Sequence, residues 1–201
     1  MKIVIVGCGR VGASVAEAYD RTGHQVTILD IATSAFDRLP STFGGVAIRG
    51  DGTDEDVLLR AGAEGADVFL AVTEGDNRNV MAAQLANEAL GIERVIAKIN
   101  DPLRAKAYAE LGIATLCRTG LMQDAVDRYL GLPPTGLPGM LAPTGHHDAH
   151  GPIGSTPPGT TRTIPAGASG ASGASGGVRI TELAPSVPTP PVAGPAATQE
   201  V

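Results

Sequence analysis

The chain has 201 residues, a formal net charge of −6 and only two cysteines, Cys8 and Cys117. This length allows one domain with an extension or two small domains, and the acidic balance argues against the basic surface that nucleic-acid binding requires. We expect no disulfide framework, a reducing cytoplasm, no signal peptide and no membrane span, because no apolar run approaches the roughly 20 residues that cross a bilayer.

Residues 1–132 alternate strand and helix signals. Apolar, β-branched runs predict six strands, at residues 2–7, 25–30, 46–50, 67–73, 94–100 and 114–118. Near-continuous apolar strands are typical of a parallel sheet that is covered on both faces. With the helical stretches between them, they predict an α/β fold, a Rossmann-like, doubly wound parallel sheet of six strands with five intervening helices.

Local signals predict where some helices begin and end. Thr53 followed by Asp56 indicates an acidic variant of the capping box. Asp101 is the expected N-cap of a later helix, and Gly112 its expected stop.

A last predicted helix, residues 121–130, has apolar residues at helical spacing and no strand after it. It either packs back on the domain or crosses to a partner subunit.

The composition changes near Leu132. Residues 133–201 hold 25 Gly or Pro among 69 residues and no aromatic residue. Such a segment buries too little apolar surface to offset its ordering entropy, so we predict a disordered tail. Residues 178–183, VRITEL, can form a strand on a partner, although disorder is favoured there too. We expect no specific metal site at residues 146–150, HHDAH, because such a site needs fixed geometry.

The main site signal is a glycine triplet between the first strand and the first helix. Gly7 permits a tight turn, Gly9 lets a pyrophosphate approach the backbone, and Gly12 lets the helix pack close to the strand. Asp30 lies 23 residues after Gly7, at the end of the second strand. Its carboxylate can accept hydrogen bonds from both ribose hydroxyls and would repel a 2′-phosphate. NAD(H), or an adenine nucleotide with an unphosphorylated ribose, is therefore favoured over NADP.

Four more candidate residues lie at strand carboxyl ends, where this fold binds ligands. Asp51 can border the adenine or only shape a turn. Thr73 and Glu74 end the fourth strand and can contact the ligand, or Thr73 can only cap the next helix. Lys98 can reach a phosphate or carboxylate, or it can extend from a buried strand to solvent.

Two loop residues also have alternative interpretations. Arg10 can reach a polyphosphate or be a solvated residue of the first helical turn. Cys8 is better interpreted as a small filler than as a reactive thiol, although a helix N-terminus can lower a thiol pKa.

No group suited to catalysis is evident. Hydride transfer needs a substrate pocket and a proton-transfer group, and the segment after Leu132 cannot supply a folded substrate domain. His24, the one histidine before Leu132, starts the second strand, far from the strand carboxyl ends. We therefore predict that the protein is not an enzyme. A minimal NAD-dependent oxidoreductase that completes its site by dimerisation stays as an alternative.

Several motifs, in order, resemble a known family. They are "IVIVGCGRVGASVA", "GDGTDEDVLLRAG", "AVTEGDNRN" and "RVIAKINDP". They are similar to the N-terminal RCK (KTN) domains of TrkA-type potassium uptake regulatory proteins. The resemblance implies a nucleotide-binding domain over residues 1–118, a crossover or dimerisation helix over 119–132, and the tail over 133–201.

The resemblance also implies a function and a site. The protein would be a cytoplasmic regulatory subunit at the inner face of the plasma membrane, attached through a membrane potassium transporter. It would form homo-oligomers, or hetero-oligomers with a sister RCK protein, and gate potassium transport by binding NAD(H), ATP or ADP. The implied nucleotide-binding residues are Gly7, Cys8, Gly9, Arg10, Val11, Gly12, Asp30, Asp51, Gly52, Thr73, Glu74 and Lys98, with Asn79 supporting the turn after the fourth strand.

The chain departs from the family pattern in two places. Family members often carry a folded C-terminal lobe, where this chain has the Gly/Pro-rich tail. This departure leaves open a non-sensing adaptor subunit in a mixed ring. Some members bind a divalent cation through a Glu just after the sixth strand, where this chain has Arg118, Thr119 and Gly120, so we expect no metal there.

Overall fold

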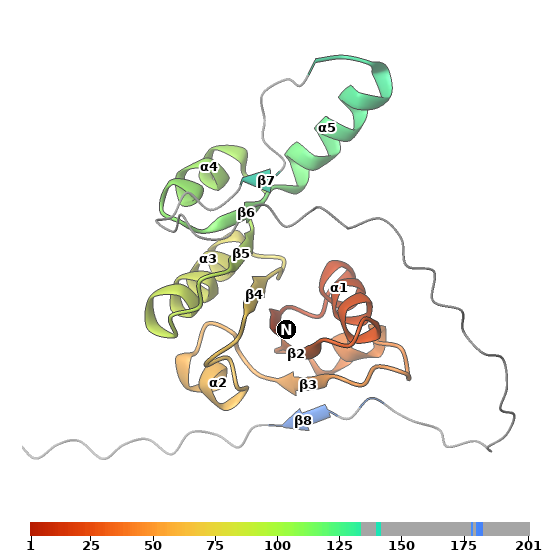
Figure 1. Ribbon diagram of the computed structural model, residues 1–201, viewed down its shortest axis with the longest axis vertical. Helices are drawn as coiled ribbons and strands as arrows, with labels where there is room; N and C mark the ends of the chain where they lie inside the picture. Colours follow the sequence, from red (N-terminus) through yellow and green to blue (C-terminus); the bar gives the residue numbers. More distant parts are fainter. Residues whose placement is uncertain (134–139, 142–177, 179, 183–201) are drawn as a thin grey trace, which may run out of the picture.

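A single sheet forms the centre of the structure (Figure 1). The computed structural model describes residues 1–133, 140–141, 178 and 180–182. The strands are β1 (Lys2–Val6), β2 (Gln25–Asp30), β3 (Val46–Arg49), β4 (Val68–Ala71), β5 (Val95–Lys98), β6 (Ala114–Leu116), β7 (Met140–Leu141) and β8 (Ile180–Glu182). The helices are α1 (Arg10–Arg21), the 3-10 helix η1 (Thr33–Arg38), α2 (Glu55–Arg60), α3 (Asp76–Gln84), the π-helix η2 (Leu85–Ala89), α4 (Pro102–Glu110) and α5 (Arg118–Leu130).

The predicted doubly wound fold is confirmed. The strands run in the order β3-β2-β1-β4-β5-β6, and each pair in this series is parallel. Side chains of β1 alternate between two buried layers: Ile3 and Ile5 lie with residues of α1 and η1, whereas Val4 and Val6 lie with residues of α2 and α3. Burial on both faces explains why the strands have continuous apolar runs.

The strand count differs from the prediction. The described residues form eight strands rather than six, because β7 pairs antiparallel with β6 and β8 pairs parallel with β3. Edge strands present unpaired N–H and C=O groups, and a further strand can satisfy them. Residues 180–182 therefore form a strand on their own chain, although disorder was favoured for them. The rest of the predicted tail, including HHDAH, lies outside the described residues except for 133, 140–141 and 178.

The helix-end signals are partly confirmed. Asp101 caps α4, where its carboxylate accepts hydrogen bonds from the backbone N–H groups of Leu103 (2.9 Å) and Arg104 (3.3 Å). The predicted cap of α2 was wrong by one residue, because Asp54 is the N-cap and accepts from the backbone of Val57. Thr53 instead belongs to the preceding turn, where its hydroxyl donates to the Asp51 carboxylate at 2.8 Å.

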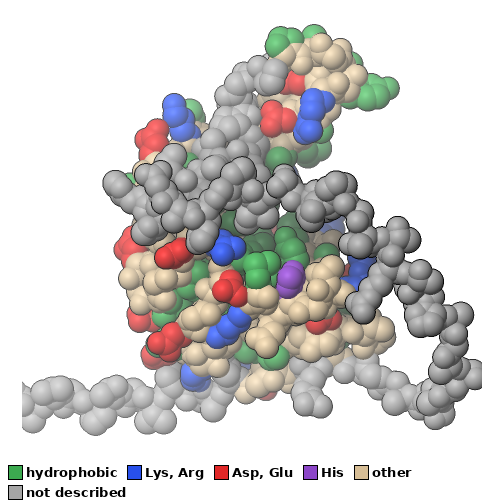
Figure 2. Space-filling model, viewed as in Figure 1, with side chains coloured by type: hydrophobic (Ala, Val, Ile, Leu, Met, Phe, Trp, Pro, Cys, Tyr) green, Lys and Arg blue, Asp and Glu red, His purple; other side chains and the backbone are tan. Residues whose placement is uncertain are grey.

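Helix α5 projects from the body of the domain (Figure 1). Its apolar side chains are exposed, with Met122 at 66% and Tyr129 at 90%, and only Gly120 and Asp127 are buried. Figure 2 shows these hydrophobic side chains at the top of the molecule. Within the described residues, α5 therefore does not pack its apolar side back on the domain.

Both cysteines are free and buried. Among the helices of residues 1–133, none combines the length and the hydropathy that crossing a bilayer requires.

Candidate nucleotide-binding site

A cavity of about 280 Å³ lies at the carboxyl ends of the central strands. It is next to the point where the strand order reverses between β1 and β4, which is where ligands bind in doubly wound sheets. Its lining residues are Val6, Gly7, Cys8, Gly9, Asp30, Ile31, Ala32, Ala35, Arg38, Gly50, Asp51, Gly52, Val72, Thr73, Glu74 and Arg78.

The structure brings eight of the twelve predicted site residues to this cavity. They are Gly7, Cys8, Gly9, Asp30, Asp51, Gly52, Thr73 and Glu74. Arg10 and Val11 are instead exposed in the first turn of α1, and Gly12 is buried beneath the loop. Lys98 is half-buried at the end of β5 and does not line the cavity.

Each glycine of the loop has a distinct structural reason. Gly7 has φ +104°, and a Cβ there would lie 2.9 Å from the backbone nitrogen of Thr73. A Cβ on Gly12 would lie 1.9 Å from the Gly7 carbonyl oxygen. In contrast, no atom lies within 4 Å of a Cβ placed on Gly9. The backbone at Gly9 is thus open to a ligand, whereas the lack of a side chain at Gly7 and Gly12 permits close packing of the loop.

The N-terminus of α1 faces this open backbone. Gly9 is the N-cap residue, and no side chain caps the first turn. Free N–H groups at a helix N-terminus, together with the helix dipole, favour a phosphate. The loop therefore fits the phosphate part of a nucleotide.

Asp30 fixes the loop as well as bordering the cavity. Its Oδ2 accepts a hydrogen bond from the backbone N–H of Cys8 at 2.8 Å, and its Oδ1 accepts from that of Ala32 at 2.9 Å. Each carboxylate oxygen has a second lone pair, so the side chain keeps acceptor capacity for ribose hydroxyls. A substitution at Asp30 would change both the loop and its acceptor groups.

Asn79 holds the turn after β4. The side chain is fully buried, and its Oδ1 accepts from the backbone N–H (2.8 Å) and the hydroxyl (2.6 Å) of Thr73. Its Nδ2 donates to the carbonyls of Thr73 (3.1 Å) and Lys98 (2.8 Å). This one amide joins the ends of β4 and β5 and fixes the cavity wall at Thr73.

Asp51 shapes a turn, which is one of the two roles predicted for it, and it also lines the cavity. Its carboxylate accepts from the backbone N–H of Thr53 at 3.0 Å. The neighbouring Gly52 packs on β1, where a Cβ would lie 2.3 Å from a methyl group of Val6.

Two ionisable groups near the cavity have shifted pKa values. Burial, with a smaller contribution from the Asp30 carboxylate, raises the pKa of the Cys8 thiol to about 11, and Arg38 opposes this shift. The thiol is therefore protonated at neutral pH. Burial also lowers the pKa of Lys98, and the charge of Arg118 adds to this effect.

Sequence reasoning missed two cationic residues of the cavity. Arg38 comes from η1 and Arg78 from α3, and both line it. The motif "AVTEGDNRN" contains Arg78, but nothing in its spacing distinguishes this arginine from a solvated one. The pair places two positive charges in a lining that also holds the carboxylates of Asp30, Asp51 and Glu74, so an anion can be attracted locally, beside the arginines.

Comparison with known proteins identifies relatives. The sequence model of the TrkA-N domain family matches residues 3–119, which is more than half of the chain. A relative from Streptomyces coelicolor, "Trk system potassium uptake protein TrkA", is 46% identical over 145 residues. That match covers 72% of this chain and 65% of the relative, so the chain spans less than two thirds of the relative's length.

Solved structures share the fold. The TrkA-N domain of the inner membrane protein ybaL from Escherichia coli has a TM-score of 0.58 at 18% identity, covering 64% of this chain and 96% of that one. The Kef C-terminal domain of Shewanella denitrificans, in its AMP-bound form, has a TM-score of 0.51 at 23% identity, covering 66% of this chain and 84% of that one. Both likenesses concern the fold alone.

Proposed function

Since this chain belongs to the TrkA-N domain family, we propose that it is a nucleotide-sensing regulatory subunit of a potassium uptake system. The observation that carries the proposal is the open backbone of Gly9 at an uncapped helix N-terminus, on a cavity that also holds Asp30 and two arginines. Such a cavity suits a nucleotide with a free ribose and at least one phosphate.

The ligand that we propose is NAD(H), ATP or ADP. The Asp30 carboxylate would accept from the ribose hydroxyls, and the N–H groups of the glycine loop would donate to a phosphate. Arg38 and Arg78 would contribute positive charge, and Arg10 or Lys98 would add to it for a longer phosphate chain. The AMP bound to the Shewanella denitrificans domain of the same fold supports an adenine nucleotide.

We propose the following organisation. Residues 1–118 form the nucleotide-binding domain, and residues 119–132 form a helix through which the subunit makes a homo-oligomer or joins a sister RCK protein. The exposed apolar side of α5 supports this role. The partner is a membrane potassium transporter, which holds the subunit at the cytoplasmic face of the plasma membrane. The name of the Streptomyces coelicolor relative supports that partner.

We consider an enzymatic role less well supported. The Cys8 thiol has a pKa of about 11 and is a poor nucleophile at neutral pH. His24 lies near the amino end of the sheet, where its Nδ1 is 3.4 Å from the N-terminal amine. A minimal oxidoreductase that completes its active site by dimerisation is the alternative, and it would consume NADH with a small carbonyl compound.

Thermal unfolding with NADH, NAD, ATP and ADP tests the proposal. A ligand at 100 times its dissociation constant stabilises a protein by about 2.7 kcal/mol. We expect this shift with at least one of the four and its loss in Gly9→Asp, whose carboxylate would repel the phosphate. The matched control is Ala18→Asp, which adds the same charge on the exposed surface of α1. No shift with any of the four would contradict nucleotide sensing and favour a non-sensing adaptor.

A further inference from the structure

The outer edge of β3 is paired with a segment from the far end of the chain. β8 lies beside β3 in parallel, with Ala47 opposite Ile180 and Arg49 opposite Glu182. Without this segment, β3 would present a row of unpaired backbone groups. Addition of an extended segment to such an edge is a common mode of peptide recognition.

Few side-chain contacts hold β8 in place. Val178 packs, partly buried, against the hydrophobic layer that α1 and η1 cover. Ile180 is 39% exposed, and the side chains of Arg49 and Glu182 form an ion pair while 50% and 71% exposed. Exposed ion pairs contribute little, and a three-residue strand adds few backbone hydrogen bonds. The attachment is therefore weak enough to exchange between docked and free states.

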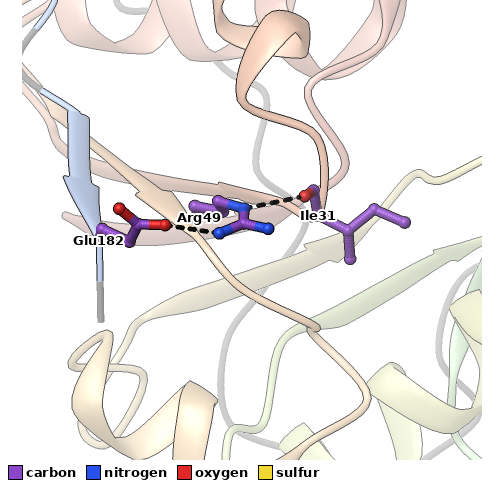
Figure 3. Close-up of polar contacts among 3 residues, drawn as sticks. All are labelled: Ile31, Arg49 and Glu182. Carbon is purple, nitrogen blue, oxygen red and sulfur yellow. Dashed lines mark hydrogen bonds and ion pairs between the residues drawn. The ribbon is translucent and has the colours of Figure 1, made fainter. Parts of the chain in front are cut away.

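Arg49 lies between Glu182 of this strand and Ile31, as Figure 3 shows. One side of its guanidinium contacts Glu182, and its Nε donates to the carbonyl of Ile31 at 3.4 Å. Ile31 and the residue after Arg49, Gly50, both line the cavity. The backbone N–H of Gly50 also donates to the Asp30 carbonyl at 3.0 Å. Two short backbone segments, residues 30–31 and 49–50, thus connect the docked strand to the cavity.

The length of the intervening chain favours docking within one subunit. The 36 residues between β7 and Val178, residues 142–177, have a contour length of roughly 120 Å, several times the diameter of a domain of this size. A tethered segment has a high effective concentration at any site that its linker can reach. A weak strand is therefore captured by its own chain before a second copy.

We propose that β8, with Val178 beside it, is a docking strand that the chain places on its own β3 edge, and that Arg49 couples the docked strand to the cavity rim. The coupling rests on the proposed nucleotide binding, whereas the docking does not. Docking holds Arg49 and the Ile31 carbonyl in place, so it favours the ligand-binding arrangement of the rim. By linkage, a bound nucleotide then favours the docked strand to the same extent.

Amide hydrogen exchange of the full chain, without ligand, tests the docking. Replacing residues 178–182 with Gly-Ser-Gly-Ser-Gly should accelerate exchange in residues 46–49, and the same replacement at residues 196–200 should not. Charge reversal in Arg49→Glu or Glu182→Arg should accelerate exchange in residues 46–49 and in residues 178–182 by about twofold to fivefold. The double variant should restore slow exchange. Equal exchange in the 178–182 and 196–200 replacements would overturn the docking, and failure of the double variant would overturn the role of Arg49.

Mixing the two single variants separates docking within a chain from docking between chains. Each chain then carries one intact partner of the ion pair and one reversed partner. If the strand docks on its own chain, co-expressed Arg49→Glu and Glu182→Arg chains keep fast exchange. Recovery of slow exchange in the mixture would show that a second copy supplies the strand, and it would overturn the intrachain assignment.

Nucleotide affinity tests the coupling. For ADP or NADH, whichever stabilises the unmodified chain more, we expect the 178–182 replacement to weaken binding twofold to fivefold relative to the 196–200 replacement. Equal affinity would overturn the coupling and leave the docking intact. If the unmodified chain binds neither nucleotide, the proposed function and the coupling both fail, while the exchange experiment still decides the docking.

Discussion

At the scale of single residues, Gly9 and Gly12 meet different physical requirements within one loop. A methyl group on Gly12 would meet a backbone oxygen at 1.9 Å, which no side-chain movement can relieve. We expect Gly12→Ala to lower the free energy of unfolding by about 1–3 kcal/mol, the usual cost of overpacking, or more. Urea denaturation measures this change.

Gly9→Ala is the matched control, because its methyl group has open space around it. We expect its free energy of unfolding to stay within about 0.5 kcal/mol of the unmodified chain. Equal stability of the two variants would show that the close approach of α1 to the loop is not a constraint on the fold.

Cys8 gives the stability of the fold a specific pH dependence. The pKa of its thiol is about 11 when folded against the reference value of 9.0, so the folded state holds the proton more tightly. Stability from this group is complete below pH 9 and is lost as the pH rises toward 11, by about 2–3 kcal/mol. Cys8→Ala should show a correspondingly smaller decline when denaturation is measured between pH 8 and pH 11. Parallel curves for the two proteins would contradict the buried, protonated thiol.

The glycine loop and Asp30, which the sequence predicts, lie close together in the chain, whereas the two missed arginines come from distant elements. The glycine loop and Asp30 could be identified because one strand-turn-helix unit, with the strand after it, fixes their relation. Arg38 and Arg78 reach the same cavity from η1 and α3, which are far apart in sequence. Their proximity exists only once the sheet has formed, so no spacing within the sequence encodes it.

At the scale of elements, α5 has an apolar side that no described part of the chain covers. A glutamate in the middle of that side would put an uncompensated charge into any interface formed there. If the proposed oligomer forms through α5, we expect Val126→Glu to convert it to a monomer in sedimentation experiments. Val126 is 55% exposed, so the substitution leaves the domain core unaffected. Ala18→Glu on α1 is the control, and an unchanged oligomer in Val126→Glu would exclude α5 as the interface.

Strands could be predicted from sequence where burial on both faces gives a continuous apolar run, as in β1 and β4. β8 has no such run, because its side chains are exposed and its pairing with β3 joins residues more than 130 positions apart. The cap of α2 was misassigned because Thr53 and Asp54 are both capping residue types. The hydrogen bond that the Asp54 carboxylate accepts from the backbone N–H of Val57 decides between them.

At the scale of the whole molecule, gating requires more than binding. A ligand shifts an equilibrium between two conformations only by its difference in affinity for them, and a shift from 1:99 to 99:1 takes a difference of about 10⁴-fold. Two nucleotides that occupy the same cavity can therefore have opposite effects on transport if each prefers a different conformation. The phosphate chain is the part in which ATP and ADP differ, so in the proposed sensing role the phosphate end of the site would have to discriminate between them.

Potassium uptake in cells tests this sensing role. We expect Gly9→Asp, introduced into the chain in its source cells, to change rubidium uptake, because the carboxylate excludes phosphate from the loop while the open space around Gly9 leaves the fold intact. Ala18→Asp should leave uptake unchanged, since it adds the same charge away from the cavity. An unchanged rate in Gly9→Asp cells, with the protein present at its normal level, would favour the adaptor that completes an assembly without sensing a nucleotide. A changed rate would instead require that the occupied loop alters the transporter, since the substitution touches neither α5 nor the β3 edge.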